Sequence, residues 1–407
     1  MSDASAPESA ETPPQPTGGD YAPSPLNRFA VWQRAGGVML PLTTAILAFA
    51  IGGLVVLATG KNPLSVYRAV FNGTGLNWLF PWVTGQARTL AALNLQQTLI
   101  ITTTLILTGL AVAFAFRCGM FNIGGQGQYF VGGYFAVWVG STMAGLPGWI
   151  HVFLAVTIAT LGGALWAGIA GFLKATVGAH EVISTIMLNW IAVWVGQYLF
   201  GLGGPLQNSS QKFVPISNDV VAKAKLPVFW GDPILQGLDV GLFIALGALV
   251  VYWIVLNRTT LGYQVRAVGF NPEAARYGGI NVPRNYFYAM AISGAFAGLA
   301  GAVDILGWQF RISQNDIPAS ALGFIGIAVA LLGRNTALGT FFAALLFGAL
   351  LTGTSTRHLN ADIFRPDLAG NLTQIIQGLI VLFVGADVLI LTVWKQRKRL
   401  RLRRRPA

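Results

Sequence analysis

Long apolar runs separated by short polar connectors repeat along nearly the whole chain. We expect a membrane-spanning helix wherever such a run reaches about 20 residues, because that length crosses a hydrocarbon core of roughly 30 Å. Ten runs are predicted, with eight or nine possible, because glycine and short connections blur the limits near 120–145 and 318–356. The predicted spans are 38–59, 95–116, 126–145, 150–173, 181–203, 240–256, 285–307, 318–333, 336–356 and 370–394.

The two ends of the chain differ from these runs. Residues 1–36 are rich in Ser, Ala, Pro, Glu and Thr without an apolar repeat, which predicts a disordered tail rather than a cleaved signal peptide. Residues 395–407 form a strongly basic tail. Between them we predict one membrane-spanning domain over 37–394, with a long outer loop at 203–239 and a polar inner loop at 257–284.

Composition supports an all-α, polytopic integral membrane protein. The chain is 54% hydrophobic and only 10% charged, and a soluble protein with such runs would expose apolar patches larger than folded monomers tolerate. Lys and Arg gather on connectors that are cytoplasmic if both termini are inside, which predicts a multi-pass membrane protein with cytoplasmic N- and C-termini. We expect the 395–407 tail to bind anionic lipid rather than nucleic acid, and it accounts for most of the net charge of +12.

The polar inner loop contains the pattern of a short helix with both ends capped. Asn271 is a favoured N-cap residue, and Pro272 follows at the first helical position, where its missing N–H is not needed. Glu273 in the first turn and Arg276 in the last match the helix dipole. Gly278 is predicted to form a left-handed C-cap. A structured basic loop between spans is suited to binding a cytoplasmic partner; the alternative is a solvated loop with ordinary caps.

A second unusual segment runs from Arg117 to Gln128. It holds four glycines within nine residues, interleaved with Asn122, Gln126 and Gln128. Backbone at this depth cannot leave polar groups facing lipid, so it must be buried in protein or line a wet cavity, as the broken helices of transporters do. The amides would then cap helix ends or bond a polar solute. The plainer alternative is a tight turn whose glycines permit close helix packing.

Three further residues within spans are candidates for the solute path. Asn189 beside Trp190 would hydrogen-bond and stack a base, or else serve as interhelical amide contact and lipid-facing indole. Asp304 is predicted to face water or a protein partner, because an unpaired acid in lipid costs a few kcal/mol. An ion-coupled secondary transporter would need several such buried carboxylates, and the predicted spans contain few.

Enzyme and metal chemistry find little support. A lone Cys118 excludes an internal disulfide and a thiolate metal cluster. The three histidines lie far apart without ligand spacing, and no nucleophile–base pair is recognisable. The nearest Gly-Lys pair to a phosphate-binding loop, Gly60-Lys61, lacks both the preceding glycine and the following Ser or Thr. We therefore expect no bound cofactor, no metal and no catalytic residue.

Four ordered blocks resemble the permease subunits of bacterial ABC importers for nucleosides and simple sugars, a branched-chain amino acid permease-like family. They are Gly119–Gln128, Glu181–Asn189, Leu261–Ile280 and Gly326–Gly333, and the resemblance covers about 30–394. Two positions depart from the family pattern. Gln126 replaces a frequent glutamate, and His180 replaces a common asparagine.

The resemblance implies a type II importer that moves a nucleoside-type solute inward, with a simple sugar or another small polar solute as the alternative. It also implies a second permease subunit, identical or paralogous, an extracytoplasmic solute-binding protein and cytoplasmic ABC ATPases that bind the ATP. The expected ATPase-coupling residues are Gly269, Asn271, Pro272, Glu273, Ala274, Ala275, Arg276 and Gly279. The expected solute-path residues are Asn122, Gln126, Gln128, Asn189, Trp190 and Asp304.

Overall fold

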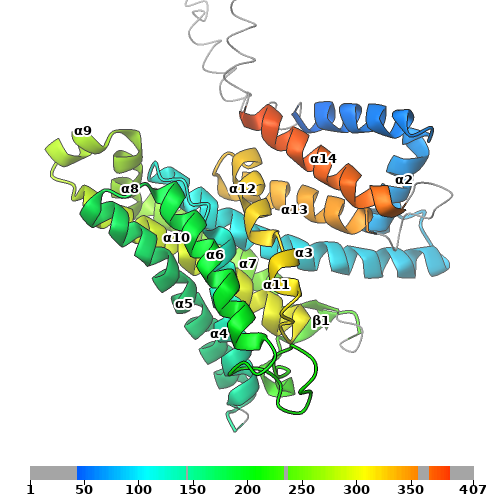
Figure 1. Cartoon of the computed structure of the whole chain (residues 1–407). Helices are drawn as coiled ribbons and strands as arrows, with labels where there is room; N and C mark the ends of the chain where they lie inside the picture. The colour runs from blue at the N-terminus through cyan, green and yellow to red at the C-terminus, as the bar shows by residue number, and fades with distance from the viewer. Residues whose placement is uncertain (1–43, 144, 233–236, 356–365, 386–407) are drawn as a thin grey trace, which may run out of the picture.

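The computed structural model describes residues 44–143, 145–232, 237–355 and 366–385 (Figure 1). The predicted tails at 1–36 and 395–407 lie outside these residues. The helices are Thr44–Ala58, α2 (Pro63–Thr74), η1 (Leu76–Leu79), α3 (Gly85–Arg117), α4 (Gly125–Thr142), α5 (Gly148–Val177), α6 (Glu181–Phe200), η2 (Ala222–Ala224), α7 (Gly241–Arg258), α8 (Thr260–Phe270), α9 (Pro272–Tyr277), α10 (Val282–Asp304), η3 (Ile305–Gln309), α11 (Asp316–Ala319), α12 (Leu322–Leu332), α13 (Ala337–Gly353) and α14 (Pro366–Gly385).

Each predicted span overlaps a helix within the part of the chain that the structure describes. Five helices there are long and apolar enough to cross a membrane: α3, α5, α6, α7 and the continuous α10–η3 unit. Three others are apolar but shorter. The chain is therefore a helical membrane protein with several spans. Helix α3 begins at Gly85, ten residues before the predicted start, because its first turns are polar and extend beyond the apolar run.

Two helices and one small sheet were not expected. Helix α2 is capped by Asn62, whose side chain accepts a hydrogen bond from Leu64 N, and α8 is capped in the same way by Thr259. Within the 203–239 loop, β1 (Val228–Trp230) pairs antiparallel with β2 (Leu238–Asp239). The all-α prediction therefore holds for the transmembrane body but missed this short hairpin.

Helix α10 lies at the centre of the bundle and packs against α3, α4 and α5. Small residues allow this close approach, as is common between membrane helices. A Cβ added to Gly298 would lie 2.5 Å from the carbonyl oxygen of Ala159, and one added to Gly163 would lie 2.4 Å from that of Gly294. Larger side chains at these glycines would therefore force α5 and α10 apart.

The two long connectors lie at opposite ends of the bundle. Figure 1 shows α8 and α9 projecting at the upper left, whereas β1 and its neighbouring loops lie at the lower right. That these two connectors face opposite sides of a membrane stays a prediction.

Candidate functional site

Helices α4 and α12 begin inside the bundle rather than at its end. Gly132, two turns into α4, meets Gly298, which lies about 24 Å along α10 from Val282 at 1.5 Å per residue. A Cβ on Gly323, in the first turn of α12, would lie 2.4 Å from the Cα of Gln126. The N-termini of α4 and α12 therefore meet deep in the protein. Half-helices that start within a membrane protein commonly surround transport sites.

Residues 118–124 connect the end of α3 to the start of α4, and Gly119 terminates α3. Gly119 has a left-handed φ of 73°, and the N–H of Met120 returns to the carbonyl oxygen of Ala115 at 3.1 Å, as in a Schellman motif. Asn122 within the segment is 0% exposed. Cys118, Met120 and Gly124 are buried as well, whereas Gly119 is exposed. Most of the segment is thus buried in protein, which is one of the two environments expected for it.

Asn122 and Gln128 form a closed amide pair. The Nδ2 group of Asn122 donates to Gln128 Oε1 at 2.9 Å and to Ser293 Oγ at 2.7 Å. Asn122 Oδ1 accepts from Gln128 Nε2 at 3.0 Å and from Gly124 N at 2.8 Å. The hydroxyl of Ser293 in turn donates a hydrogen bond to the carbonyl oxygen of Ala111. These contacts tie the connecting segment to α3 and α10.

Gln126 caps the N-terminus of α12. Its Oε1 accepts hydrogen bonds from the N–H groups of Gly323 and Phe324 at 2.8 and 3.2 Å, and its Nε2 donates to the carbonyl oxygen of Ser320 at 2.9 Å. A glutamate at this position would also accept from the two N–H groups, but an ionised carboxylate would have no proton for Ser320. The amide at position 126 therefore fits its surroundings here.

Asn189 caps the N-terminus of α4 in a similar way. Its Oδ1 accepts from the N–H of Gly127 at 2.8 Å, and its Nδ2 donates to the carbonyl oxygen of Ile123 at 3.0 Å. The neighbouring Trp190 is 59% exposed, and no hydrogen bond of the junction described above involves it. The contacts thus favour helix capping and interhelical bonding for the four amides Asn122, Gln126, Gln128 and Asn189; that any of them or Trp190 contacts solute stays a prediction.

Asp304 closes a second polar group, which we call the Asp304 cluster (Tyr129, Asp304 and Gln309). The carboxylate is 3% exposed and accepts hydrogen bonds from the Tyr129 hydroxyl and from Gln309 Nε2. Gln309 ends the π-helix η3, and Phe310 follows with a left-handed φ of 60°. Single π-turns and strained non-glycine residues are concentrated at functional sites.

A small cavity adjoins the Asp304 cluster. Its lining combines aromatic rings with polar groups: Tyr129, Phe130, Gly133, Tyr134, Ile305, Gln309, Ile312, Asp316, Ile317 and Ser320. The rings of Phe130 and Tyr134 are parallel within 2°. Aromatic faces with a few convergent polar groups suit a planar polar solute. The volume of about 50 Å³ is far below the roughly 300 Å³ of small ligand sites, so the cavity must widen to admit one.

The residues of this cavity were mostly missed from the sequence. Phe130 and Tyr134 look like ordinary span residues, and Gln309 only became a candidate once η3 placed it on Asp304. The one available signal was the acid at 304 within an apolar run. Without the fold, nothing linked it to α4.

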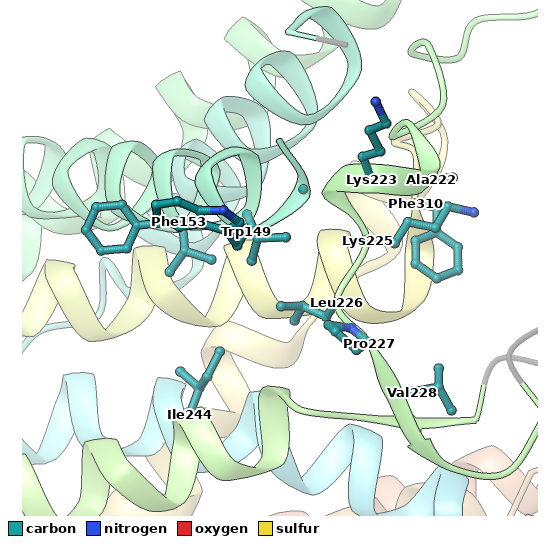
Figure 2. Close-up of a pocket in the computed structure, with 13 residues that line it drawn as sticks. Trp149, Phe153, Ala222, Lys223, Lys225, Leu226, Pro227, Val228, Ile244 and Phe310 are labelled. Carbon is teal, nitrogen blue, oxygen red and sulfur yellow. The ribbon is translucent and has the colours of Figure 1, made fainter. Parts of the chain in front are cut away.

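A larger cavity of about 830 Å³ lies beside the outer-loop residues 222–228 (Figure 2). Its lining is mainly apolar, with Trp149 and Phe153 on one side, and Lys223 and Lys225 at the rim. The ammonium of Lys225 lies 4.0 Å from the ring centroid of Phe310. Few polar groups face its interior, so we do not consider it the solute site.

Helix α9 carries the cap that the sequence predicts at its start. Asn271 Oδ1 accepts from Glu273 N and Ala274 N at 2.9 and 3.1 Å, and Pro272 is the first helical residue. The predicted left-handed cap at Gly278 is wrong, because its φ is −76°. Its N–H still continues the helix to Ala274 O. The reversal comes one residue later, at Gly279, with a φ of 79°.

Nearly the whole of α9 is exposed, including Glu273, Ala274 and Arg276, and only Ala275 is buried. Two aromatic side chains flank it that the sequence reasoning missed: Phe270 is 94% exposed and Tyr277 is 93% exposed. Large aromatic side chains are rarely left in water without a partner, and together with arginine they dominate binding hot spots. Their position inside the otherwise polar loop 257–284 could have identified them as candidate contact residues.

Gly269, near the end of α8, brings α8 into contact with the end of α3. A Cβ at this position would lie 2.3 Å from the carbonyl oxygen of Arg117, and Gly269 Cα lies 3.2 Å from the Cβ position of Gly119. The end of α8 therefore rests directly on the start of the 118–124 segment. Only glycine allows the two backbones to approach so closely.

Known proteins resemble this chain over most of its length. Residues 94–385 match the family described as the branched-chain amino acid transport system / permease component. The guanosine ABC transporter permease protein of Bacillus subtilis is 38% identical over 88% of this chain and 96% of its own length. The nucleoside ABC transporter permease protein NupB of Lactococcus lactis is 33% identical over 87% and 92%.

A glucose ABC transporter permease protein of Haloferax volcanii is likewise 33% identical, over 84% of this chain and 86% of its own length. No solved structure matches. The family match extends from the middle of α3 to the end of α14 and so includes the α4–α12 junction, the Asp304 cluster and α9. The chain belongs to the permease component family of the branched-chain amino acid transport system type.

Proposed function

We propose that this chain is the membrane-spanning permease subunit of an ATP-driven ABC importer in the bacterial inner membrane, and that its solute is a nucleoside. The observation that carries the proposal is a capped, exposed helix, α9, flanked by unpaired aromatic surfaces in a chain of the permease family. Two relatives named for guanosine and nucleoside transport, at 38% and 33% identity, support the solute class.

The solute passes, in this proposal, beside the Asp304 cluster. The rings of Phe130 and Tyr134 offer faces on which a base can stack, and Gln309 and Asp316 offer groups for its polar edge. The side-chain amides of Asn122 and Gln126 hold the N-terminal ends of α4 and α12 in place, and these two ends border the region. Opening requires α4 and η3 to separate, since the present cavity is too small.

ATPase binding at α9 drives that opening. Arg276, Phe270 and Tyr277 form the anchor of an interface in which a groove of a cytoplasmic ATPase receives α9. Motion of α9 moves α8, and the contact of Gly269 with Arg117 passes it to the 118–124 segment. That segment continues along the backbone into α4 and Tyr129, so one packing contact, between Gly269 and Arg117, links the coupling helix to the solute cavity.

The remaining parts of the proposal concern assembly and orientation. The α8–α9 end faces the cytoplasm, both termini are cytoplasmic, and the 203–239 loop at the opposite end binds a solute-binding protein. A second permease subunit, identical or paralogous, completes a type II importer with about ten spans in each subunit. ATP is bound by the ATPase partner, and this chain binds neither cofactor nor metal.

The test is uptake by the complex reconstituted in vesicles with its ATPase and solute-binding protein. We expect radiolabelled guanosine to accumulate only with ATP on the ATPase side, and excess unlabelled glucose to leave it unchanged. Uptake of glucose but not guanosine would favour the second candidate, which the glucose permease relative supports. Uptake by the chain alone under a proton or sodium gradient would contradict an ATP-driven permease.

A further inference from the structure

A cavity of about 360 Å³ lies at the α8–α9 end of the bundle, where α3, α7, α8 and the α12–α13 turn meet. Its lining comes from four separate parts of the chain: Arg117, Tyr252, Trp253, Leu256, Asn257, Arg266, Asn335, Thr336, Ala337 and Leu338. The proposed transport mechanism uses the backbone of Arg117 but assigns no ligand to this cavity. It is distinct from the solute cavity, which is lined by α4, η3 and α11.

The polar side of the cavity is positively charged. Arg117 and Arg266 line it, and none of the ten lining residues is acidic. Arg258 stands nearby, its guanidinium carbon 5.3 Å from the Trp253 ring centroid. Two ion pairs of the described residues, Lys174 with Glu181 and Arg311 with Asp219, lie away from this cavity.

The side chain of Arg117 is fixed by hydrogen bonds to the α12–α13 turn. Its Nε and Nη2 both donate to the carbonyl oxygen of Asn335, at 3.0 and 2.7 Å, and the Tyr252 hydroxyl donates to the same oxygen at 2.7 Å. Asn335 presents that oxygen from a left-handed turn with a φ of 53°. These bonds fix the orientation of the guanidinium at the wall of the cavity.

The start of α13 adds to the positive potential. Thr336 caps this 17-residue helix by accepting from Gly339 N at 3.1 Å, and Ala337 and Leu338 of the first turn line the cavity. A helix N-terminus carries a partial positive charge. Together with the two arginines, it favours an anion in the cavity.

The other side of the cavity is apolar and open. Trp253 is 45% exposed and Leu338 is 74% exposed, and both lie next to charged or polar residues of the same cavity. A free inorganic anion would gain nothing from these side chains. An amphipathic anion would place its charge on the arginines and its hydrocarbon against the tryptophan and leucine.

We propose that this cavity binds an anionic phospholipid of the adjacent leaflet. Its phosphate lies between Arg117 and Arg266, and its acyl chains run along Trp253 and Leu338. Such a lipid bridges α8 to α3 and α13, and so holds α8 against the Arg117 end of the 118–124 segment. Basic pockets between helices at the membrane surface bind anionic headgroups by the same physics.

The proposal is tested by native mass spectrometry of the purified chain equilibrated with phosphatidylglycerol or phosphatidylcholine. We expect one phosphatidylglycerol to be retained in preference to phosphatidylcholine. Arg266→Gln should weaken its retention about fivefold, the equivalent of ~1 kcal/mol for one basic residue at an anionic surface. Arg266→Lys should retain most of the binding, because the charge is kept.

Arg284→Gln is the matched control. Arg284 belongs to the same polar loop and is exposed, with its Nε bonded to the Tyr288 hydroxyl at 3.0 Å, and it does not line the cavity. Its loss should leave phosphatidylglycerol retention unchanged. Equal retention by wild type and Arg266→Gln, equal retention of phosphatidylcholine, or displacement of the lipid by millimolar inorganic phosphate would each overturn the proposal.

Discussion

Polar residues serve opposite purposes in helix α9 and in the amide group at the α4–α12 junction. In α9, the side chains of Glu273 and Arg276 are exposed to solvent. At the junction, Asn122, Gln126 and Gln128 are at most 2% exposed, and each forms several internal hydrogen bonds. The first set is therefore available to a partner, whereas the second is required by the fold.

The two regions also differ in the reach of their hydrogen bonds. Asn271 caps α9 through groups two and three residues away. Asn122 and Gln126 bond groups that are 171 and 197 residues away. Substitutions in α9 should therefore change coupling while the protein stays folded, and substitutions at the junction should reduce stability.

The largest effect is expected at Gly269, where the end of α8 that leads into α9 rests on the start of the 118–124 segment that leads into α4. Replacing Gly269 with alanine would put a Cβ 2.3 Å from the carbonyl oxygen of Arg117, so α8 must move away from the 118–124 segment. We expect solute-stimulated ATP hydrolysis in the reconstituted complex to fall at least about tenfold, the effect of 1.4 kcal/mol on a rate. Gly278→Ala is the control, because its Cβ would be 3.4 Å from the nearest atom; equal loss in both variants would contradict this account.

Removing the Gln126 side-chain amide should reduce stability next most strongly. Gln126→Leu leaves the N–H groups of Gly323 and Phe324 without their acceptor, and each buried unsatisfied group costs about 1–3 kcal/mol. Gln126→Glu keeps the acceptor and loses only the bond to Ser320. Thermal unfolding in detergent should rank wild type above Gln126→Glu and that above Gln126→Leu. A leucine variant as stable as wild type would show that the junction does not need this cap.

The exposed aromatics of α9 should affect partner binding alone. Phe270→Ala and Tyr277→Ala should each weaken ATPase binding by about 2 kcal/mol, the scale of an interface hot spot. The unfolding temperature should stay within error, since both side chains are more than 90% exposed. Phe213, 94% exposed on the opposite end of the molecule, provides the control. If Phe213→Ala weakened ATPase binding equally, the surface would not be specific.

An effect on stability that depends on pH is expected from Asp239 at the end of the β1–β2 hairpin. Burial raises the pKa of its carboxyl from 3.8 to about 6, although the N–H of Gly241 donates to it. The folded state therefore holds the proton more tightly, so stability is greatest near pH 4 and falls as the pH rises through 6. The change is on the order of 2–3 kcal/mol at most. Asp239→Asn should flatten this dependence in thermal unfolding between pH 4 and 7, and an unchanged slope would contradict the assignment.

Local features of the fold could be read from the sequence, and distant contacts could not. The apolar runs predicted the helices, and Asn271-Pro272 predicted the start of α9, because hydrophobic burial and capping act within a few residues. The left-handed residue was placed one position early, since Gly278 and Gly279 are equally permissive in sequence. The start of α3 was placed too late because its first turns are polar, and α8 was missed because it lies within the polar inner loop.

The candidate site was only partly predictable for the same reason. Asp304 was identified as an acid in an apolar run, but its partner Tyr129 lies 175 residues away, and no local pattern joins them. Gly269 was expected in the coupling loop, yet its contact with Arg117 depends on how α8 packs against α3. The aromatic lining of the solute cavity required both α4 and η3.

The central claim is that α9 is the surface through which an ATPase moves this subunit. The most direct test is solute-stimulated ATP hydrolysis by the reconstituted complex carrying Glu273→Arg together with Arg276→Glu. Because both side chains are exposed, we predict that stimulation is abolished while the unfolding temperature of the permease is unchanged. Wild-type stimulation in this double variant would contradict the claim.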